Sequence, residues 1–423
     1  MLCRRFRRPY TGHLVPAVTA RPAPTAGLRV LIGADTYPPQ VNGAAFFTYR
    51  LAHGLAARGH DVHVCCPAED GDAVVEYEDG ITVHRVRSVR TPFHHTFRVA
   101  NPATVRRDVA EVCTEVQPDV SHVQNHFLIG RALCRLAGRT NLPLVATNHF
   151  MPENLLPYLP LPEPVARLIT KLAWHDLASV FAPASALTTP TPTAARLVTA
   201  SGIGKHVEPV SCGIDLDRFK AQPDGTHNGE RKRILFVGRL DAEKHIDDLV
   251  DALPAVREHV DAELVVAGIG NLRDDLEARA SDRGVAEYVR FLGYVPDEDL
   301  PGLYSSADVF CMPGTAELQS LVTLEAMATG RPVVAADAMA LPHLCQHGRN
   351  GFLHRPRNHA ELGEHVRTIL TDDTLRARMG RESLVIAMGH DQTASLQRFE
   401  QIYGEVTGFR LPARRGASEP VAA

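Results

Sequence analysis

Short apolar runs alternate with amphipathic segments along most of the chain. The runs lie at 28–33, 61–66, 81–86, 119–123 and 143–148, and again at 233–238, 262–268, 289–293, 307–312 and 331–336. Between the first two, Phe47, Leu51 and Leu55 recur at the helical period in a segment that opens at Asn42 and ends at Gly59. This alternation is typical of parallel sheets with helices on both faces, so the sequence predicts an α/β protein.

The strand and helix pattern restarts once, which predicts two domains. The 423 residues are enough for two cores. Residues 219–232 are polar and rich in turn formers, as expected of a linker. We therefore predict a first Rossmann-like domain over 28–218 and a second over 233–390.

The two ends differ from this pattern. Residues 391–408 carry Leu396, Phe399 and Tyr403 at helical spacing with no strand before them, and 409–423 is predicted to be a frayed tail. Residues 1–27 contain five arginines, no acid and several prolines. We expect a disordered basic extension there, with an arm that touches anionic lipid as the alternative.

Charge and composition narrow the function. Without the extension the chain has 40 basic and 49 acidic residues, a net of −9, which disfavours a nucleic-acid partner. No run of eighteen apolar residues and no secretory signal is present, so we expect a cytoplasmic protein. Eight cysteines without C-x2-C spacing indicate reduced thiols.

A short helix between two glutamates is the most informative segment. Leu321, Leu324 and Ala328 share one helical face, and Glu325 lies one turn in, about 7 Å from the helix start. Free N–H groups at that start, from Ser320 and Leu321 onward, favour a phosphate. Glu325 would then bind the ribose hydroxyls. Glu317, before the helix, would face the group beyond the phosphates, and a phosphate-linked sugar fits this arrangement.

The surrounding residues carry a family resemblance. The E-x7-E run followed by AMATGRPVVA resembles the donor-site signature of glycosyltransferase family 4, which comprises retaining sugar transferases. TAELQS before VTLEAMA is similar to the branch that includes bacterial diacylglycerol glucosyltransferases. The resemblance implies the GT-B fold, in which two Rossmann-like doubly wound domains face a central cleft. It also implies that the helix at 391–408 crosses back onto the first domain.

A second motif of the family follows the first strand of the second domain. Gly238 and Arg239 begin a segment, GRLDAEK, that resembles G-R-L-x-x-E-K and ends at Lys244. On that resemblance, Arg239 and Lys244 hold the diphosphate and offset the charge that develops as the sugar leaves, with no metal or other cofactor required. Alone, two cations near a helix start would be expected to be solvated.

The nucleoside is expected beside two glycine-containing turns. Gly270 belongs to a G-x-G after the next strand, and Gly293, Tyr294 and Val295 match positions whose backbone contacts the base in the family. Backbone contacts provide no side-chain code for the base. We favour a UDP-sugar over GDP-mannose.

Three residues of the first domain are further candidates. Gly43 lies in the loop that approaches the donor phosphates in the family, although many members have paired glycines there. His149 follows a strand and matches a histidine that faces the sugar and the reacting centre. His126 also follows a strand and is a candidate acceptor-side residue, or a residue that supports the site from behind.

The resemblance also implies a mechanism. No carboxylate motif is placed as a nucleophile, so the family's same-face substitution is expected, with Glu317 orienting the sugar and His149 supporting the positive centre. The D-x-D strings at 215–217 and 297–299 match, respectively, the family's G-I-D segment and a helix start. We predict no metal site.

The acceptor remains open between a diacylglycerol-type lipid and a small soluble metabolite. The segment 151–177 is rich in leucine and carries Arg167 and Lys171, so it is either a peripheral membrane contact on the inner face or a packed lid. Two other functions are compatible with the fold, a sugar-nucleotide epimerase and an inactive sugar-nucleotide-binding subunit. The inactive subunit is disfavoured because four donor-site residues are retained: Arg239, Lys244, Glu317 and Glu325.

Overall fold

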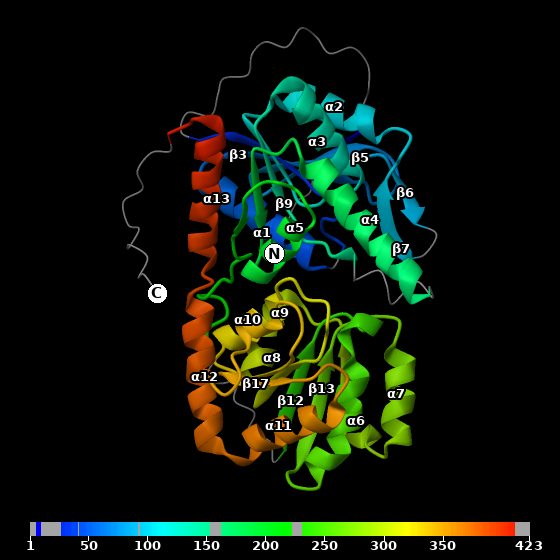
Figure 1. The fold of residues 1–423 in the computed structure, drawn as a ribbon, viewed down its shortest axis with the longest axis vertical. Coiled ribbons are helices and arrows are strands. Elements are labelled where there is room, and N and C mark those ends of the chain that lie inside the picture. Colours follow the sequence, from blue (N-terminus) through cyan, green and yellow to red (C-terminus); the bar gives the residue numbers. More distant parts are fainter. Residues whose placement is uncertain are drawn as a thin grey trace.

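A computed structural model describes residues 6–9, 27–40, 42–91, 94–152, 162–221 and 231–410. Two α/β domains lie one above the other, and a column formed by the last two helices runs along one side of both (Figure 1). The chain enters the second domain after the 219–232 segment, and most of that segment lies outside the described residues.

The first domain is a nine-stranded sheet covered by helices. Its sheet order is β1-β4-β5-β3-β2-β8-β9-β10-β11, and β6 and β7 form a separate hairpin. The strands are β1 Phe6–Pro9, β2 Arg29–Gly33, β3 Asp61–Pro67, β4 Val74–Glu78, β5 Ile81–Val86, β6 Ser88–Thr91, β7 His94–Ala100, β8 Val120–Val123, β9 Leu144–Thr147, β10 Ala186–Thr189 and β11 Val207–Pro209. The helices are α1 Gly43–Ala57, α2 Val105–Val116, α3 Leu128–Thr140, α4 Glu163–Phe181 and α5 Pro192–Ala200.

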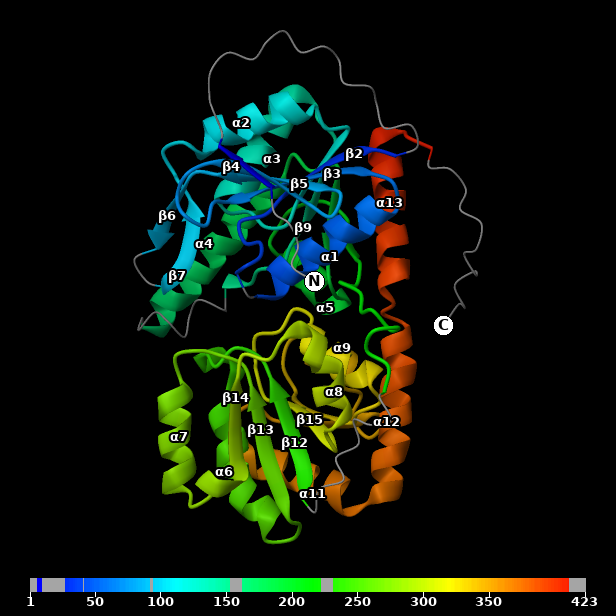
Figure 2. The ribbon, with the colours of Figure 1, turned by 180° about the vertical axis from the view of Figure 1, so that it is seen from behind.

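The second domain is a six-stranded, fully parallel sheet in the order β14-β13-β12-β15-β16-β17. Its strands are β12 Lys232–Val237, β13 Ala262–Ala267, β14 Val289–Gly293, β15 Val309–Met312, β16 Val333–Ala336 and β17 Gly351–His354. Its helices are α6 Ile246–Arg257, α7 Arg273–Asp282, α8 Leu300–Ser305, α9 Leu321–Ala328, α10 Leu341–Leu344, α11 His359–Thr371 and α12 Asp373–Met388, with 3-10 turns η3 Ala242–Lys244, η4 Ala286–Tyr288 and η5 Asp297–Asp299. The order reverses at β12, and the carboxyl ends of its strands face the first domain (Figure 2).

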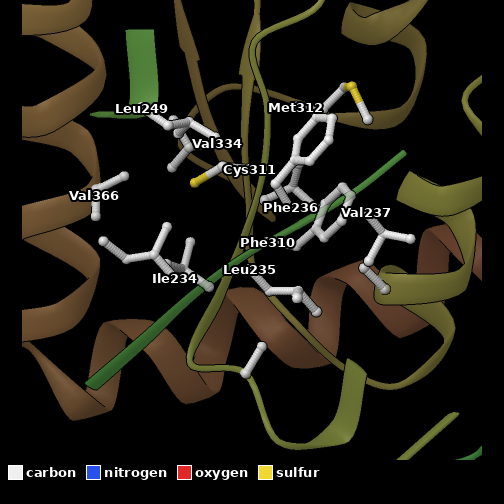
Figure 3. Close-up of a cluster of buried hydrophobic side chains, with 14 of the residues drawn as sticks. Ile234, Leu235, Phe236, Val237, Leu249, Phe310, Cys311, Met312, Val334 and Val366 are labelled. Atoms are coloured by element: carbon white, nitrogen blue, oxygen red, sulfur yellow. The ribbon is translucent and has the colours of Figure 1, made fainter. Parts of the chain in front are cut away.

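Apolar residues on both faces of the second sheet explain why its strands are continuous apolar runs. Ile234, Leu235 and Phe236 of β12 are buried and pack with Phe310 of β15 and Val334 of β16 (Figure 3). Parallel strands covered by helices on both faces need apolar side chains at successive positions. This core makes β12 and its neighbours a rigid base for the loops that follow them.

Helix α13, Gln392–Thr407, joins the second domain back to the first. Its Phe399 and Tyr403 are buried in a core cluster of the first domain, and the Tyr403 hydroxyl lies 2.7 Å from Nδ1 of His122. Glu400 of the same helix pairs with Arg58 at 3.1 Å. Because α12 and α13 follow one another with only a short break, they connect the two domains, and Ile214, shortly before the linker, pairs with Asp391 at that break.

The GT-B architecture expected from the sequence is confirmed, and each apolar run named above contains a strand. One expectation is corrected. Residues 6–9, inside the extension predicted to be disordered, pair antiparallel with β4 as strand β1, because β4 is otherwise an edge with unpaired backbone groups. The rest of the extension, and the tail after residue 410, lie outside the described residues. The described cysteines are free thiols, and all but Cys113 are buried.

Candidate active site

Two adjoining cavities lie where the domains face each other. The first, about 220 Å³, is bounded by α1 of the first domain and by the carboxyl ends of β12, β13 and β15, together with the start of α9, in the second. The second cavity, about 290 Å³, extends from it toward the first domain. Asn42, Gly43, Arg239, Lys244 and Glu317 line both, so the cavities form one continuous cleft.

The start of α9 forms one wall of the first cavity. Ser320 is the N-cap residue and has extended backbone; its Oγ accepts a hydrogen bond from the Thr323 hydroxyl at 2.8 Å and caps no backbone N–H group of the helix. Ser320, Leu321 and Val322 line the cavity. The first N–H groups of a helix have no partner within it, and the helix dipole adds positive potential there. This wall therefore suits an anionic group, as the sequence predicts.

Glu325 lies one turn further along α9 and is almost completely buried. Its Oε1 accepts a hydrogen bond from Nη2 of Arg50 at 2.9 Å, and its Oε2 accepts one from the Tyr304 hydroxyl at 2.9 Å. Glu325 still lines the first cavity. Each carboxylate oxygen has a second lone-pair direction, so the group can accept hydroxyl hydrogen bonds while both protein donors remain bound.

The two predicted cations are already paired with carboxylates. Lys244 Nζ lies 2.5 Å from Oε1 of Glu317. Arg239 bridges Asp241 at 2.5 Å and Glu243 at 2.9 Å. Glu243 is buried, and that burial raises the pKa of its carboxyl above its usual value. Lys244 is thus held by an acid that the sequence predicts for the site, whereas Asp241 and Glu243, which hold Arg239, were not predicted as site residues.

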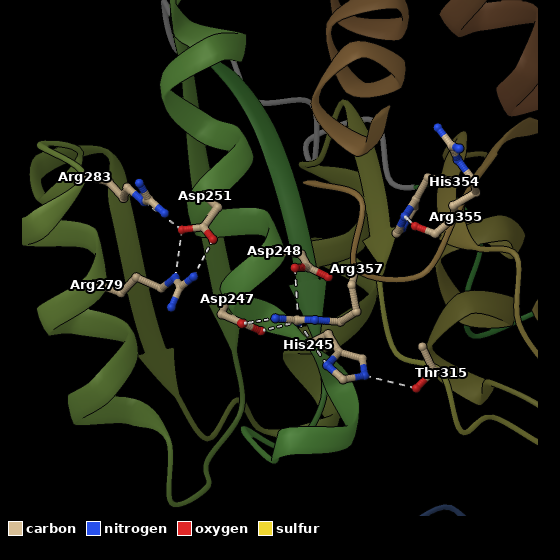
Figure 4. Close-up of polar contacts among 10 residues, drawn as sticks. All are labelled: His245, Asp247, Asp248, Asp251, Arg279, Arg283, Thr315, His354, Arg355 and Arg357. Carbon is tan, nitrogen blue, oxygen red and sulfur yellow. Dashed lines mark hydrogen bonds and ion pairs between the residues drawn. The ribbon is translucent and has the colours of Figure 1, made fainter. Parts of the chain in front are cut away.

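A polar network fixes the turn that carries Lys244 (Figure 4). His245, directly after η3, has left-handed backbone with φ 50°, and its Nε2 lies 3.0 Å from Oγ1 of Thr315. Arg357 binds Asp247 through two nitrogens, at 2.7 and 3.0 Å. Since Thr315 belongs to the loop that leads to Glu317, the Lys244 turn and the Glu317 loop are positioned together.

The predicted glycines divide into two groups. Gly43 and Gly238 line the first cavity, and a Cβ at Gly43 would meet no heavy atom within 4 Å, so the space beside it is open. Gly270 and Gly293 line neither cavity. A Cβ at Gly270 would lie 2.5 Å from the carbonyl oxygen of Leu240, which gives that glycine a packing role.

Tyr294 and Val295 do line the first cavity, as Arg50 and Glu325 do, and none of these four lines the second. The Tyr294 side chain is exposed. Lys244 and Glu317, in contrast, line both cavities. The sequence predicts the nucleoside beside the first group and the phosphates and sugar beside the second.

His149 lines the second cavity across from Glu317 and Lys244. Its Nε2 lies 3.1 Å from Oε1 of Gln124, and its ring packs on Phe47 with centroids 4.7 Å apart. Burial lowers the pKa of His149 to about 3, so the ring is neutral near pH 7. Because the Gln124 oxygen can only accept, Nε2 carries the proton in this arrangement.

His126 lies behind the wall of the second cavity and does not line it. Its buried ring packs against Phe127 and Phe150, with centroids 4.5 and 5.5 Å away, and both phenylalanines line the cavity. Burial lowers the pKa of His126 to about 4. A direct contact with an acceptor does not fit this position, whereas support of the two aromatic rings does.

Asp35 is a site residue that the sequence analysis missed. It follows β2, lines the second cavity and is buried. Its carboxylate accepts N–H hydrogen bonds from Ile129 at 2.9 Å and Gly130 at 3.3 Å, at the start of α3. Burial raises the pKa of Asp35 to about 6 despite these bonds. The position at a strand end was the signal that could have found it.

The two D-x-D strings have structural roles in the described part of the chain. Asp215 Oδ1 accepts the backbone N–H groups of Asp217 and Arg218, and Asp297 pairs with Arg218 at 2.6 Å. Among the residues that the structure describes, no three His, Cys, Asp or Glu side chains come together as metal ligands would.

Arg50 is a further residue that the sequence analysis missed. Gly43, Phe46 and Arg50 of α1 are spaced at i, i+3 and i+7 and all line the first cavity. The helical period could have indicated a shared face. It could not have indicated that this face meets α9.

Comparisons with known proteins agree with this geometry. Residues 41–218 match the family model described as Glycosyltransferase Family 4, and residues 217–384 match the model described as Glycosyl transferases group 1. An uncharacterized glycosyltransferase of Methanocaldococcus jannaschii is 30% identical over 359 residues, covering 79% of this chain and 87% of that protein. A GDP-mannose-dependent alpha-(1-6)-phosphatidylinositol monomannoside mannosyltransferase of Mycobacterium tuberculosis is 29% identical over 401 residues, covering 90% and 97%.

Solved structures share the fold. A sucrose-phosphate synthase from Thermosynechococcus elongatus superposes with a TM-score of 0.76 at 18% identity, covering 90% of this chain and 99% of the other. Anabaena HepE in complex with UDP gives a TM-score of 0.71 at 19% identity, covering 89% and 100%.

The fold and the cleft define the chain as a GT-B glycosyltransferase, an enzyme that transfers a sugar from a nucleotide sugar. It belongs to glycosyltransferase family 4.

Proposed function

We propose that this enzyme transfers a hexose from a nucleoside diphosphate to a hydroxyl group of a lipid acceptor, with retention at the anomeric carbon and without a metal ion. The observation that carries the proposal is how the cleft divides these groups. Tyr294 and Glu325 line the first cavity alone, whereas Lys244 and Glu317 line both cavities. This division supports a donor whose base and ribose lie in the first cavity and whose sugar lies toward the second, with the diphosphate beside Lys244 and the α9 start.

The chemistry follows from this placement. The acceptor oxygen attacks the anomeric carbon from the face that the diphosphate leaves, the bond from that carbon to the phosphate oxygen breaks, and the departing phosphate oxygen takes the acceptor's proton. The α9 N–H groups, Arg239 and Lys244 stabilise the charge on the leaving diphosphate. Glu317 orients the sugar. Neutral His149 adds no positive charge beside the cationic centre that develops.

The base of the donor is either uracil or guanine, and the assay with UDP- and GDP-hexoses described below distinguishes them. The sequence favours a UDP-sugar, whereas a similar mycobacterial protein is named as GDP-mannose-dependent. Another relative, of Streptococcus pneumoniae, is named alpha-monoglucosyldiacylglycerol synthase and is 26% identical, covering 73% of this chain and 71% of that protein. Both names include a lipid, which supports a lipid acceptor here.

Helix α4 supports a membrane contact. Val165, Leu168, Ile169 and Leu172 are exposed on its first half, with Arg167 and Lys171 beside them. The second half packs into the core through Leu177 and Phe181. This exposure does not fit a packed lid for the helix, and the leucine-rich residues 153–161 before it lie outside the described residues. In the part of the chain that the structure describes, no helix is long and apolar enough to cross a membrane.

A donor panel with product analysis tests the transfer. The enzyme is incubated with UDP- and GDP-hexoses, with and without diacylglycerol or phosphatidylinositol, and the product anomer is assigned by NMR. We expect release of one nucleoside diphosphate only with a lipid acceptor, and a product with the donor's anomeric configuration. Inversion would overturn the same-face mechanism. An isomerised donor without acceptor would identify an epimerase, and turnover by a Glu317→Gln variant at the wild-type rate would overturn the site assignment.

Vesicle sedimentation tests the membrane contact. Leu168→Glu should release the protein from vesicles that contain anionic lipid, because it places a charge in the apolar stripe of α4. Leu384→Glu is the matched control, since Leu384 is similarly exposed on α12. Equal sedimentation of wild-type and Leu168→Glu proteins would contradict the contact.

A further inference from the structure

An ion pair between the two domains lies in the wall of the first cavity. Arg50 comes from α1 of the first domain and Glu325 from α9 of the second, and Nη2 and Oε1 are 2.9 Å apart. Both side chains are largely buried, 14% exposed for Arg50 and 5% for Glu325. The pair is therefore shielded from solvent, and a charge interaction is stronger in such a shielded place than in water.

The pair fixes the orientation of the Glu325 carboxylate. Tyr304, fully buried in the second domain, donates its hydroxyl to Oε2, while Arg50 binds Oε1 from the opposite domain. The carboxylate is thus held at both oxygens, and it faces the cavity in a defined orientation. Without Arg50, it would keep only the Tyr304 bond and would be a buried negative charge beside the site proposed for a diphosphate.

Arg50 also has a free donor. Its Nη1 is buried and has no hydrogen-bond partner among the described residues. Buried donors without partners are rare in proteins, so such a group calls for an explanation. Arg50 lines the same cavity as Glu325 and Tyr294, so an acceptor atom of a bound ligand would supply the missing partner.

We infer that Arg50 is a nucleoside-binding residue that the first domain contributes to the donor site. Nη2 holds Glu325 in position for the ribose hydroxyls, and Nη1 donates a hydrogen bond to an oxygen of the nucleoside. This inference rests on the proposed function, because it assumes a nucleoside diphosphate in the first cavity. It adds that donor affinity depends on both domains, before any acceptor binds.

Arginine suits this position better than lysine. The guanidinium presents nitrogens in a fixed plane, so one can bind Glu325 while another faces the ligand. A lysine has one nitrogen on a flexible stem and can replace the ion pair without supplying the second donor in a fixed direction. The substitution Arg50→Lys therefore separates the two parts of the proposed role.

Calorimetric titration of the full-length protein with UDP and GDP tests the inference. For the nucleotide that the wild type binds, we expect Arg50→Ala to weaken affinity roughly tenfold to hundredfold, as for loss of a charged hydrogen bond. Arg50→Lys should fall between. Arg107→Ala, which removes an exposed arginine paired with Glu111 on α2, is the matched control and should bind like the wild type.

The 2′,3′-dideoxy form of the same nucleotide isolates the role of Glu325. This ligand lacks the ribose hydroxyls. The loss of affinity caused by Arg50→Ala should therefore be at least threefold smaller for the dideoxy nucleotide than for the normal nucleotide. An equal loss for both ligands would overturn the proposed hold on Glu325. Thermal unfolding without ligand checks that each variant is folded, and Arg50→Gln replaces Arg50→Ala if the latter is not.

The outcomes separate this inference from the proposed function. If the wild type binds neither UDP nor GDP, both are overturned. If the wild type binds one of them and the Arg50 variants bind it equally well, only the inference is overturned. In steady-state assays the inference also requires a raised KM for the donor with the KM for the acceptor unchanged, which a general loss of structure would not produce.

Discussion

Lys244 and Glu317 are in contact, with Nζ and Oε1 2.5 Å apart, although they belong to loops after two different strands. The residue proposed to neutralise the leaving diphosphate thus also holds the residue proposed to orient the sugar. One ion pair connects the two halves of the reacting region. Its side chains are 16% and 12% exposed, so solvent screens it little.

Removal of Lys244 should therefore reduce turnover in two ways. Lys244→Ala leaves the diphosphate charge less stabilised and leaves Glu317 without this partner. We expect kcat to fall roughly 100-fold or more, the usual effect of losing a group that stabilises developing charge. Lys232→Ala is the control, because that lysine also pairs with acids, Asp308 and Asp373, but at the opposite end of β12. A steady-state assay with comparable losses for the two variants would contradict this role.

His149 should have no titration step in the pH range of the assay. Burial lowers its pKa to about 3, so the ring stays neutral between pH 5 and pH 9. We expect His149→Ala to lower kcat roughly tenfold or more, as for loss of a group at the reacting centre, while the shape of the pH profile is unchanged. The measurement is kcat/KM against pH for both proteins. If the wild-type pH profile had a limb between pH 6 and pH 7 that is absent in the variant, the prediction of a neutral His149 would be wrong.

Asp35 should make stability depend on pH. Burial raises its pKa to about 6, so the unfolded chain ionises first, and the folded state loses stability as pH rises through the folded pKa. Between pH 5 and pH 7.5 this loss is about 1.4 kcal/mol.

Asp35→Asn lacks that titration. Between pH 5 and pH 7.5, the free energy of unfolding of the variant minus that of the wild type should therefore increase by about 1.4 kcal/mol. Any difference between the two proteins that does not depend on pH leaves this change unaffected. Urea unfolding at several pH values measures the difference. A difference that does not change with pH would show that Asp35 titrates alike in both states.

The sequence could predict what local patterns determine. The α9 segment has its own helical period and an anion-binding start, and the GRLDAEK turn follows a strand end, so both were found from residues close together in the chain. The buried strands were found for the same reason. Short strands in a hairpin or at a sheet edge, such as β6 and β17, were missed because a few partly buried residues give little periodicity.

Contacts between distant segments could not be predicted in this way. Arg50 and Glu325 are 275 positions apart, and their pairing depends on how one domain sits on the other. His126 shows a related limit. Its place after a strand left open both a direct contact with the acceptor and a supporting role, and the structure places its ring behind Phe127 and Phe150, which line the cavity. A strand-end position shows that a residue is near the cleft, not that its side chain reaches it.

Two glycines of the cleft should respond oppositely to alanine. At Gly43, the first residue of α1, a Cβ meets nothing within 4 Å, and alanine is the better helix former. Gly43→Ala should therefore leave the melting temperature unchanged or slightly raised. The added methyl occupies the open space where the diphosphate is proposed to approach, so the KM for the donor should rise roughly tenfold, about the cost of a mild steric conflict.

Gly268 is the matched comparison. It has φ +144°, and a Cβ there would lie 1.8 Å from the carbonyl oxygen of Gly238, which belongs to the backbone and cannot move aside. Gly268→Ala should lose roughly 2 kcal/mol or more of stability, through strain rather than through lost ligand contact. Thermal unfolding and donor KM, measured on both variants, separate the two effects. If Gly43→Ala were destabilised like Gly268→Ala, the glycine at position 43 would be needed for the fold. The proposal that the donor phosphates approach Gly43 would then lose its support.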